Sequence, residues 1–168
     1  MNSKRIAIDA GEMNEEIGFQ FLVQLVARYP KEQVTLVCFF EEECRWQHRF
    51  AECMKWSPHC WSVDGRTRYL AGNREEASEI LPVLTKEMAE PEQKRSYVIF
   101  LWKEEWIQSE VLHSCLLRDP ESYPVIVIGC RSKDSFFEGK WNEIIKKHRM
   151  DFKKYPLMDR EWRSVTYK

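Results

Sequence analysis

Short apolar runs alternate with longer segments whose apolar residues recur at helical spacing. An apolar run bounded by polar residues is typical of a buried strand, and a spacing of three to four residues is typical of a helix that packs on a sheet. This alternation predicts an α/β protein, a layered α/β sandwich with a mainly parallel sheet. The expected strands are Arg5–Asp9, Gln33–Phe40, Thr67–Ala71, Tyr97–Trp102 and Tyr123–Gly129.

The run Tyr97–Trp102 is the strand around which we expect the sheet to form. Its residues are apolar or aromatic throughout, which indicates a strand that is covered on both faces. In nucleotide-hydrolysing α/β proteins, such a strand ends in an acidic residue that helps to hold Mg²⁺. Trp102 and Lys103 stand at that point here, and neither side chain offers the oxygen ligand that Mg²⁺ requires.

The segment between the first two expected strands predicts a long helix. Asn14 fits its N-cap, and Glu15 and Glu16 stand in the first turn, where the helix dipole favours acidic side chains. The helix is expected to run to about Tyr29 and to stop before Pro30. Its apolar residues wrap most of the circumference, so we expect it to be buried on most sides. The remaining polar stripe consists of Gln20, Gln24 and Arg28.

Three further segments have helical character. Glu41–Met54 is charged and aromatic, and Trp106–Leu117 places apolar residues at helical spacing. Asn73 fits the N-cap of another helix, with Glu76 three residues later as its capping-box partner. Pro82 lies inside the pattern of that helix, so we expect either a kink there or a late helix start.

The carboxyl-terminal part of the chain is less periodic. Trp141–Phe152 fits a hairpin or a helix, and the tail beyond Tyr155 is expected to be poorly ordered. A length of 168 residues fits one domain. We therefore expect a single α/β domain over residues 1–168, with residues 4–130 as its core and residues 131–168 as a C-terminal extension.

Composition narrows the classes of function. The formal net charge is −1 and no basic run contains interleaved aromatic residues, so we expect no nucleic-acid partner. The apolar runs are too short to cross a bilayer, and Met1–Arg5 leads into a strand without the apolar stretch of a secretory signal. The six cysteines lack the spacing of a disulfide framework, which favours the reducing cytosol. We expect a cytoplasmic domain that does not insert into a membrane.

The turn after the first strand lacks the residues of a phosphate-binding loop. A P-loop needs closely placed glycines, followed by a lysine and a serine or threonine. Gly11 and Gly18 are too far apart for this motif, and Phe19 and Gln20 stand where the lysine and the hydroxyl residue would follow. Glu12 adds a negative charge that would repel a triphosphate.

Other catalytic or metal-binding chemistry has little support in the sequence. Asp9 ends the first strand, but no partner carboxylate or histidine can be identified for acid–base catalysis. Cysteine and histidine residues crowd one stretch, yet they lack the close pairs, such as C-x₂-C, of zinc sites. We therefore expect no catalytic residue, no cofactor and no metal site. The crowded residues are Cys44, His48, Cys53, His59 and Cys60.

An ordered set of sequence features resembles a known family. The most specific feature is a W-x-P-H-x-W loop at Trp56–Trp61, followed by Arg66. The set resembles the cytosolic segment that precedes the ATPase modules in the type VII secretion membrane ATPases, the EssC/EccC-type members of the FtsK/SpoIIIE class. The resemblance covers roughly residues 4–130. The features are, in order, Val34–Val37, Lys55–Trp61, Arg66–Ala71, Asn73–Ala77, Tyr97–Phe100 and Pro124–Val127, and Phe21–Ala27 resembles the first helix of the family.

This resemblance implies a degenerate ATPase-like module with a fold like that of a P-loop NTPase (Rossmann-like) and without its own catalysis. Such a module lies between the membrane-proximal part and the first ATPase module of a protein-translocating motor. It implies partners in the rest of a membrane-anchored secretion ATPase and in other secretion-machinery components, at the cytosolic face of the cell membrane. The isolated module is expected to be a monomer and the parent protein an oligomer. Many family members carry acidic residues where this chain has Trp102 and Lys103, which weakens the case for a metal site further.

The aromatic loop is the candidate interaction site. Trp56 and Trp61 fit interface anchors because tryptophan is enriched in binding hot spots, although packing of the loop on the core explains them equally well. His59 fits a titrating switch, but we favour a histidine that hydrogen-bonds to backbone. The candidate residues are Trp56, Pro58, His59, Trp61 and Arg66.

A function of a different class stays open. The alternation of strands and helices also fits a small-molecule or nucleotide-binding enzyme on a flavodoxin-like or TIR-like sheet. The residues that motivate it, Glu104, Glu105 and Ser109, follow the central strand. A deep pocket lined by acids at the carboxyl ends of the strands would favour the enzyme, and a filled site there would favour the secretion module.

Overall fold

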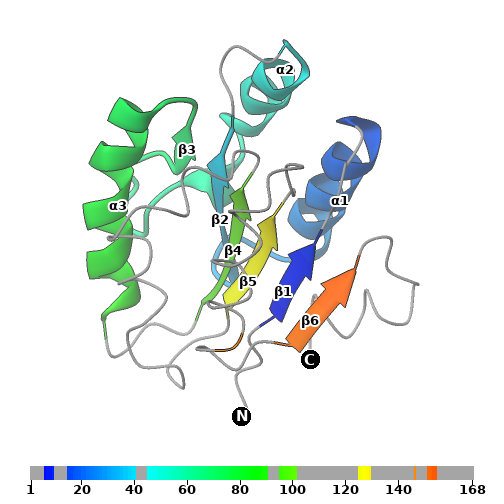
Figure 1. The fold of residues 1–168 in the computed structure, drawn as a ribbon. Helices are drawn as coiled ribbons and strands as arrows, with labels where there is room; N and C mark the ends of the chain where they lie inside the picture. The colour runs from blue at the N-terminus through cyan, green and yellow to red at the C-terminus, as the bar shows by residue number, and fades with distance from the viewer. Residues whose placement is uncertain are drawn as a thin grey trace.

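One parallel sheet organises the chain. In this computed structural model, the described residues form six strands, and every neighbouring pair is parallel (Figure 1). The predicted α/β class and the parallel sheet are confirmed. The strands are β1 Ile6–Asp9, β2 Val34–Phe39, β3 Leu70–Ala71, β4 Ser96–Leu101, β5 Val125–Gly129 and β6 Asp151–Lys154. The structure describes residues 6–9, 15–40, 45–90, 95–101, 125–129, 146 and 151–154.

The strands lie in the order β3-β2-β4-β5-β1-β6. The predicted central strand is β4, where Val98 pairs with Leu36 of β2 on one side and with Ile126 of β5 on the other. The connection from β1 leads towards β2, whereas the connection from β5 leads in the opposite direction to β6. The direction of the connections therefore reverses between the neighbours β1 and β5, between β2 and β4, and between β3 and β2. Ligands of open α/β sheets bind at such switch points, outside the carboxyl ends of the strands.

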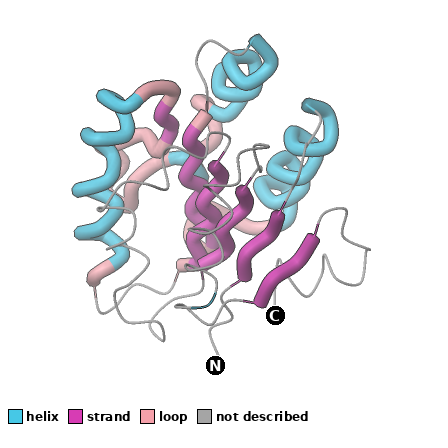
Figure 2. Tube along the Cα trace, in the orientation of Figure 1, coloured by secondary structure: helices cyan, strands magenta, loops and turns pink. Residues whose placement is uncertain are grey.

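Helices cover both faces of this sheet. Helix α1 (Glu15–Arg28) lies on one side and α3 (Arg74–Met88) on the other (Figures 1 and 2). Right-handed crossovers produce this placement, because the connections that contain α1 and α3 run in opposite directions along the sheet. Helix α2 (Arg45–Met54) lies at the end where the strands stop and contacts α1, and the short 3₁₀ helix η1 (Pro58–Cys60) contacts β2.

The apolar runs of the central strands form the core. All six side chains of β2 are buried, and Val98, Ile99 and Phe100 of β4 are at most 1 % exposed. Strands that are covered on both faces need such continuous apolar runs. Thr35 interrupts the apolar run of β2 with a polar side chain. Its hydroxyl oxygen is buried and has no hydrogen-bond partner among the described residues.

The predicted burial of the first helix on most sides is wrong for the part of α1 whose side chains are described. Leu22 and Leu25 are buried, but Val23 is 41 % exposed and Ala27 is exposed as well. A helix that lies on one face of a sheet keeps its outer half in water. The apolar residues of α1 therefore extend beyond the face that it buries.

Helix α3 begins where its predicted cap places it. The side chain of Asn73 accepts a hydrogen bond from the backbone N–H of Glu76 at 2.9 Å, as an N-cap does. The Glu76 carboxylate reaches back to the N–H of Gly72 at 2.9 Å. The alternative of a late start at Pro82 is wrong, since the helix already begins at Arg74. Pro82 is exposed, so the carbonyl that its missing N–H leaves unpaired faces the solvent side.

The strand predicted over Thr67–Ala71 is shorter than expected. Only Leu70 and Ala71 pair with β2 as a strand. The N–H of Tyr69 donates to the carbonyl of Cys60 at 2.6 Å, and Trp61 and Arg68 form an antiparallel bridge. The carbonyl of Tyr69 still accepts from the N–H of Cys38 on β2 at 2.9 Å, so the backbone just before Leu70 is shared between its own loop and the sheet.

The carboxyl-terminal part contributes a strand that the sequence pattern did not predict. Asp151 and Phe152, expected in a hairpin or helix, belong to β6, which pairs in parallel with β1. The sheet therefore extends beyond the predicted core of residues 4–130. The predicted helix Trp106–Leu117 and the tail beyond Tyr155 lie outside the described residues. Within the described ranges, no helix combines the length and apolarity needed to cross a membrane.

Candidate interaction site

The loop between α2 and β3 holds the residues predicted to form an interaction site. Ser57 caps η1, because its Oγ accepts a hydrogen bond from the backbone N–H of His59 at 3.3 Å. Pro58 occupies the first turn, where its missing N–H leaves no hydrogen bond unmade. The W-x-P-H-x-W segment thus folds into a short 3₁₀ turn that separates Trp56 from Trp61.

His59 ties this loop to the end of α1. Its Nε2 lies 2.6 Å from the carbonyl oxygen of Tyr29. A carbonyl only accepts, so Nε2 carries the proton and donates it. Nδ1 lies 3.2 Å from Ser57 Oγ and accepts in this tautomer. With 6 % of its surface exposed, His59 has the contacts of a histidine that holds the loop in place.

Both tryptophans of the motif lie beside a cation. Trp56 is 78 % exposed, and the Nζ of Lys55 lies 5.3 Å from the centre of its ring. Trp61 is half-buried, and the guanidinium carbon of Arg68 lies 4.8 Å from its ring centre. A cation over an indole face is attracted by the ring quadrupole and restricts the ring at the surface. Trp56 therefore presents a large apolar surface to solvent, whereas Trp61 lies partly against the protein.

A tight turn follows Trp61. Ser62 Oγ donates to the Asp64 carboxylate at 2.5 Å and accepts from the N–H of Thr67 at 3.0 Å. The same carboxylate accepts from the N–H of Arg66 at 3.0 Å. The Ser62 hydroxyl and then the Arg66 N–H lower the pKa of Asp64. Gly65 has a φ of 72°, a conformation that side chains disfavour. Arg66 contributes to the turn by its backbone, and its side chain is exposed.

Glu87 of α3 fixes this loop from the side of the sheet. Its carboxylate accepts the backbone N–H of Val63 at 2.6 Å, the hydroxyl of Tyr69 at 3.1 Å and the hydroxyl of Tyr97 at 2.8 Å. Both tyrosines are fully buried. Charge-assisted hydrogen bonds of this kind are stronger than neutral ones.

Sequence reasoning missed the role of Glu87, although a signal was present. Ile80 and Leu84 define the buried face of α3, and Glu87 lies seven residues after Ile80 on that same face. A carboxylate at an inward helical position needs hydrogen-bond partners. The two tyrosines on β4 and before β3 supply them.

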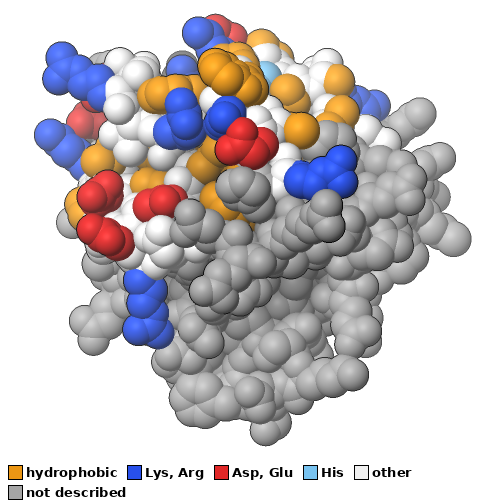
Figure 3. All heavy atoms as spheres, turned by 90° about the horizontal axis from the view of Figure 1, so that it is seen from above, with side chains coloured by type: hydrophobic (Ala, Val, Ile, Leu, Met, Phe, Trp, Pro, Cys, Tyr) orange, Lys and Arg blue, Asp and Glu red, His pale blue; other side chains and the backbone are white. Residues whose placement is uncertain are grey.

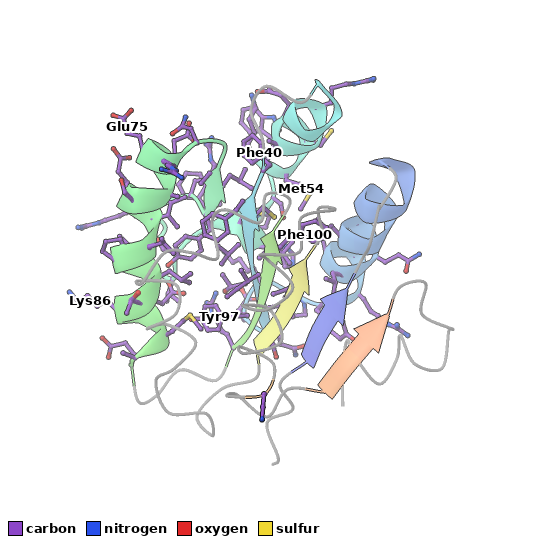
Figure 4. All side chains as sticks on the ribbon, in the orientation of Figure 1. Phe40, Met54, Glu75, Lys86, Tyr97 and Phe100 are labelled. Atoms are coloured by element: carbon purple, nitrogen blue, oxygen red, sulfur yellow. The ribbon has the colours of Figure 1, made fainter. Side chains whose placement is uncertain are left out.

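Three apolar side chains lie buried at the carboxyl end of β2 and β4, at one of the switch points of the sheet. Phe40 is 7 % exposed and Phe100 fully buried, and Met54 at the end of α2 is 4 % exposed. Figure 4 shows these three residues towards the upper end of the sheet, with Tyr97 at the opposite end. Bulky apolar side chains provide no polar group for a phosphate or a metal ion.

Most of the other predicted positions lie outside the described residues. Asp9 ends β1, where its register partners are Gly129 of β5 and Lys154 of β6, so neither neighbour is a carboxylate or a histidine. Trp102 and Lys103, which replace the metal-binding acid, and the turn after β1 lie outside the described residues. The same holds for Glu104, Glu105 and Ser109 of the alternative enzyme.

Within the described part of the chain, no three histidine, cysteine or acidic residues come together as a metal site. Cys38 and Cys60 are both buried free thiols. A hydrogen bond to Cys60 and then burial raise the pKa of Cys38. A thiol with a raised pKa is a poor nucleophile and a poor metal ligand, so Cys38 acts as a small apolar side chain of the core.

Comparison with protein-family models, curated proteins and solved structures finds no match for this chain. The resemblance to the type VII secretion ATPases stays a prediction.

Proposed function

We propose that this chain is a non-catalytic structural and regulatory module of a type VII secretion ATPase of the FtsK/SpoIIIE class. In this role it links the membrane-proximal part of the motor to its ATPase modules and contributes to protein export. Its partners are the rest of that membrane-anchored ATPase and other components of the machinery, at the cytosolic face of the membrane. The observation that carries the proposal is the order of the strands.

The strand order supports a relationship to P-loop ATPases. In the class that includes FtsK/SpoIIIE, one strand separates the strand that leads into the phosphate-binding loop from the strand that ends in the magnesium-binding acid. Here β5 lies between β1 and β4, the strands that occupy these two places. The flavodoxin-like order 2-1-3-4-5 and the Rossmann order 3-2-1-4-5-6 both place the first strand beside the second. In this sheet, β1 is separated from β2 by β5 and β4.

The residues argue for a module that lacks catalysis. Phe19 and Gln20 follow the first strand in place of the lysine and hydroxyl of a P-loop, and Trp102 and Lys103 replace the acid after β4. Phosphoryl transfer depends on those positively charged and metal-binding groups to stabilise charge. The apolar carboxyl end of β2 and β4 is consistent with this interpretation.

Thermal melting with Mg-ATP tests the absence of nucleotide binding. A ligand at about one hundred times its Kd stabilises a protein by about 2.7 kcal/mol, which raises the Tm of a domain of this size by several degrees. We expect no such rise at millimolar Mg-ATP, and no phosphate release above that of buffer. Stabilisation by Mg-ATP that requires the magnesium would contradict the proposal and favour a nucleotide-binding enzyme.

The coding sequence on both sides of this segment tests the place in a motor. We expect membrane-spanning segments before it, and modules with intact P-loops after it. A reading frame that has neither would contradict the assignment to a secretion ATPase, whatever the Mg-ATP result.

A further inference from the structure

We propose that Arg49, Lys55, Trp56, Trp61 and Arg68 form a docking surface for a short acidic segment of a partner protein. We call these five residues the basic aromatic surface. The inference rests on the proposed function and deepens it, because it names the kind of partner that such a module would bind.

Trp56 is the apolar anchor of the basic aromatic surface. It is 78 % exposed, more than any other large hydrophobic residue among those with described exposure. Leaving an indole in water forgoes the hydrophobic free energy that its burial would provide. Arg49 lies on α2, the helix that ends two residues before Trp56, and it is also exposed. Tryptophan flanked by arginine is a typical composition of a binding hot spot.

The charge around this anchor is positive. Residues 45–70 contain five Lys or Arg and two Asp or Glu. Glu52 accepts a salt bridge from Lys55, and the Asp64 carboxylate is engaged by Ser62 and Arg66 within the turn. Seen from above, the described part of the molecule shows hydrophobic side chains with Lys and Arg side chains around them, and Asp and Glu side chains among these (Figure 3). An acidic partner complements this charge.

The neighbouring helix limits the size and kind of partner. Residues 71–90, which include α3, contain two Lys or Arg and five Asp or Glu. Glu75 lies at the upper end of α3, the same end of the sheet as Phe40 and Met54 (Figure 4). A nucleic acid carries one charge on every nucleotide, so its continuing strand would meet this acidic helix and be repelled. A short acidic peptide with one apolar residue can occupy the basic region without extending across α3.

Fluorescence anisotropy with a labelled acidic peptide tests the proposal. The probe is a short peptide of glutamate and aspartate around a single leucine, and its control replaces the acids by glutamine and asparagine. We expect the acidic peptide to bind and the neutral one to bind at least about tenfold more weakly, and binding to weaken as salt rises from about 0.05 M to about 0.5 M. Equal binding of both peptides, or no binding of either, would overturn the proposal.

Matched variants locate the binding. Trp56→Ala is expected to weaken acidic-peptide binding about tenfold, and Arg49→Ala about two- to fivefold. Val23→Ala removes an exposed apolar residue on α1, and Lys86→Ala removes an exposed cation on α3, so both should bind like the parent protein. All four positions are exposed, and unchanged melting curves would confirm that each variant is folded. Loss of binding in the controls, or retention in Trp56→Ala, would contradict the assigned surface.

A labelled oligothymidylate decides between the two kinds of anionic partner. We expect it to bind more weakly than the acidic peptide at equal salt. Tighter binding that depends on Trp56 would overturn the peptide proposal in favour of a single-stranded nucleic acid. If the peptide does not bind, only the docking proposal is contradicted. If Mg-ATP stabilises the protein, the proposed function is contradicted, and a measured affinity for the peptide remains valid.

Discussion

Glu87 shows how one side chain can position the candidate loop relative to the sheet. The residue lies on α3, yet its carboxylate accepts hydrogen bonds from the loop at Val63, from Tyr69 before β3 and from Tyr97 on β4. The three donors come from separate elements, so their relative positions depend on one acceptor. His59 provides a second tie, to the carbonyl of Tyr29 at the end of α1. The exposed Trp56 therefore stands on a loop that is held at both sides.

Replacing Glu87 by glutamine should destabilise the protein. Glutamine keeps one acceptor oxygen for three donors, so at least one buried hydroxyl loses its partner. We expect the free energy of unfolding to fall by about 1–3 kcal/mol, measured by urea denaturation. Glu79→Gln changes the same charge at an exposed position of α3 and should stay within about 0.5 kcal/mol of the parent. An unchanged unfolding midpoint for Glu87→Gln would show that these hydrogen bonds add nothing to stability.

Tyr97 predicts how stability depends on alkaline pH. Burial and then the charge of Glu87 raise the pKa of Tyr97 above its ordinary value. Above about pH 10, the unfolded chain loses the tyrosine proton while the folded protein keeps it. The unfolded state then binds fewer protons, so the free energy of unfolding falls as pH rises.

Denaturation of the parent and of Tyr97→Phe between neutral and strongly alkaline pH measures this effect. The parent should lose up to about 1.4 kcal/mol per pH unit from this residue, and Tyr97→Phe should lose less over the same range. Cys38, whose pKa is also raised, is present in both proteins and adds equally to both slopes. At neutral pH, the difference in free energy of unfolding between the parent and Tyr97→Phe measures the loss of the hydrogen bond from the Tyr97 hydroxyl to Glu87. Identical alkaline slopes would contradict the prediction.

At the scale of elements, local signals predicted the start of α3 well. Asn73 and Glu76 supply their own hydrogen bonds to the backbone next to them, so the cap does not depend on distant contacts. The strand before it was predicted less well. The N–H of Tyr69 bonds to Cys60, and this partner is fixed only when the loop folds over η1. The expected burial of Val23 was also wrong, because the spacing of apolar residues does not show how many sides of a helix other elements cover.

Pro82 removes one backbone hydrogen bond from α3, and alanine at this position would restore it. Proline in a helix interior lacks one N–H and is about 3 kcal/mol less favourable than alanine, although it also restricts the unfolded chain. Because Pro82 is exposed, its ring contributes little packing. We expect Pro82→Ala to increase the free energy of unfolding by about 1–2 kcal/mol.

Chemical denaturation with far-UV circular dichroism measures this change. Ser78→Ala, at an exposed position one turn earlier, is the control and should remain within about 0.5 kcal/mol of the parent. A loss of stability in Pro82→Ala would show that the ring makes contacts that alanine cannot replace.

At the scale of the whole molecule, the sequence predicted the class of fold and four of the strands at close to their full length. Continuous apolar runs were sufficient because the central strands are buried on both faces. The order of the strands was not predictable, since it depends on crossovers between distant segments. Strand β6 was missed because Asp151–Lys154 contains two lysines and an aspartate, a composition without a buried apolar run. The candidate loop was found from its motif, but Glu87 and the cations beside the tryptophans required the tertiary structure.

The position of β1 has a consequence for synthesis of the protein. Ile6 pairs with Ile126 on one side and with Asp151 on the other, so β1 leaves the ribosome long before either of its neighbours in the sheet. Strands β2, β3 and β4 have partners within residues 34–101 and can assemble earlier. In the meantime both edges of β1 remain unpaired, a state that favours association with other chains. During synthesis, β1 therefore needs protection by chaperones until β5 and β6 have emerged.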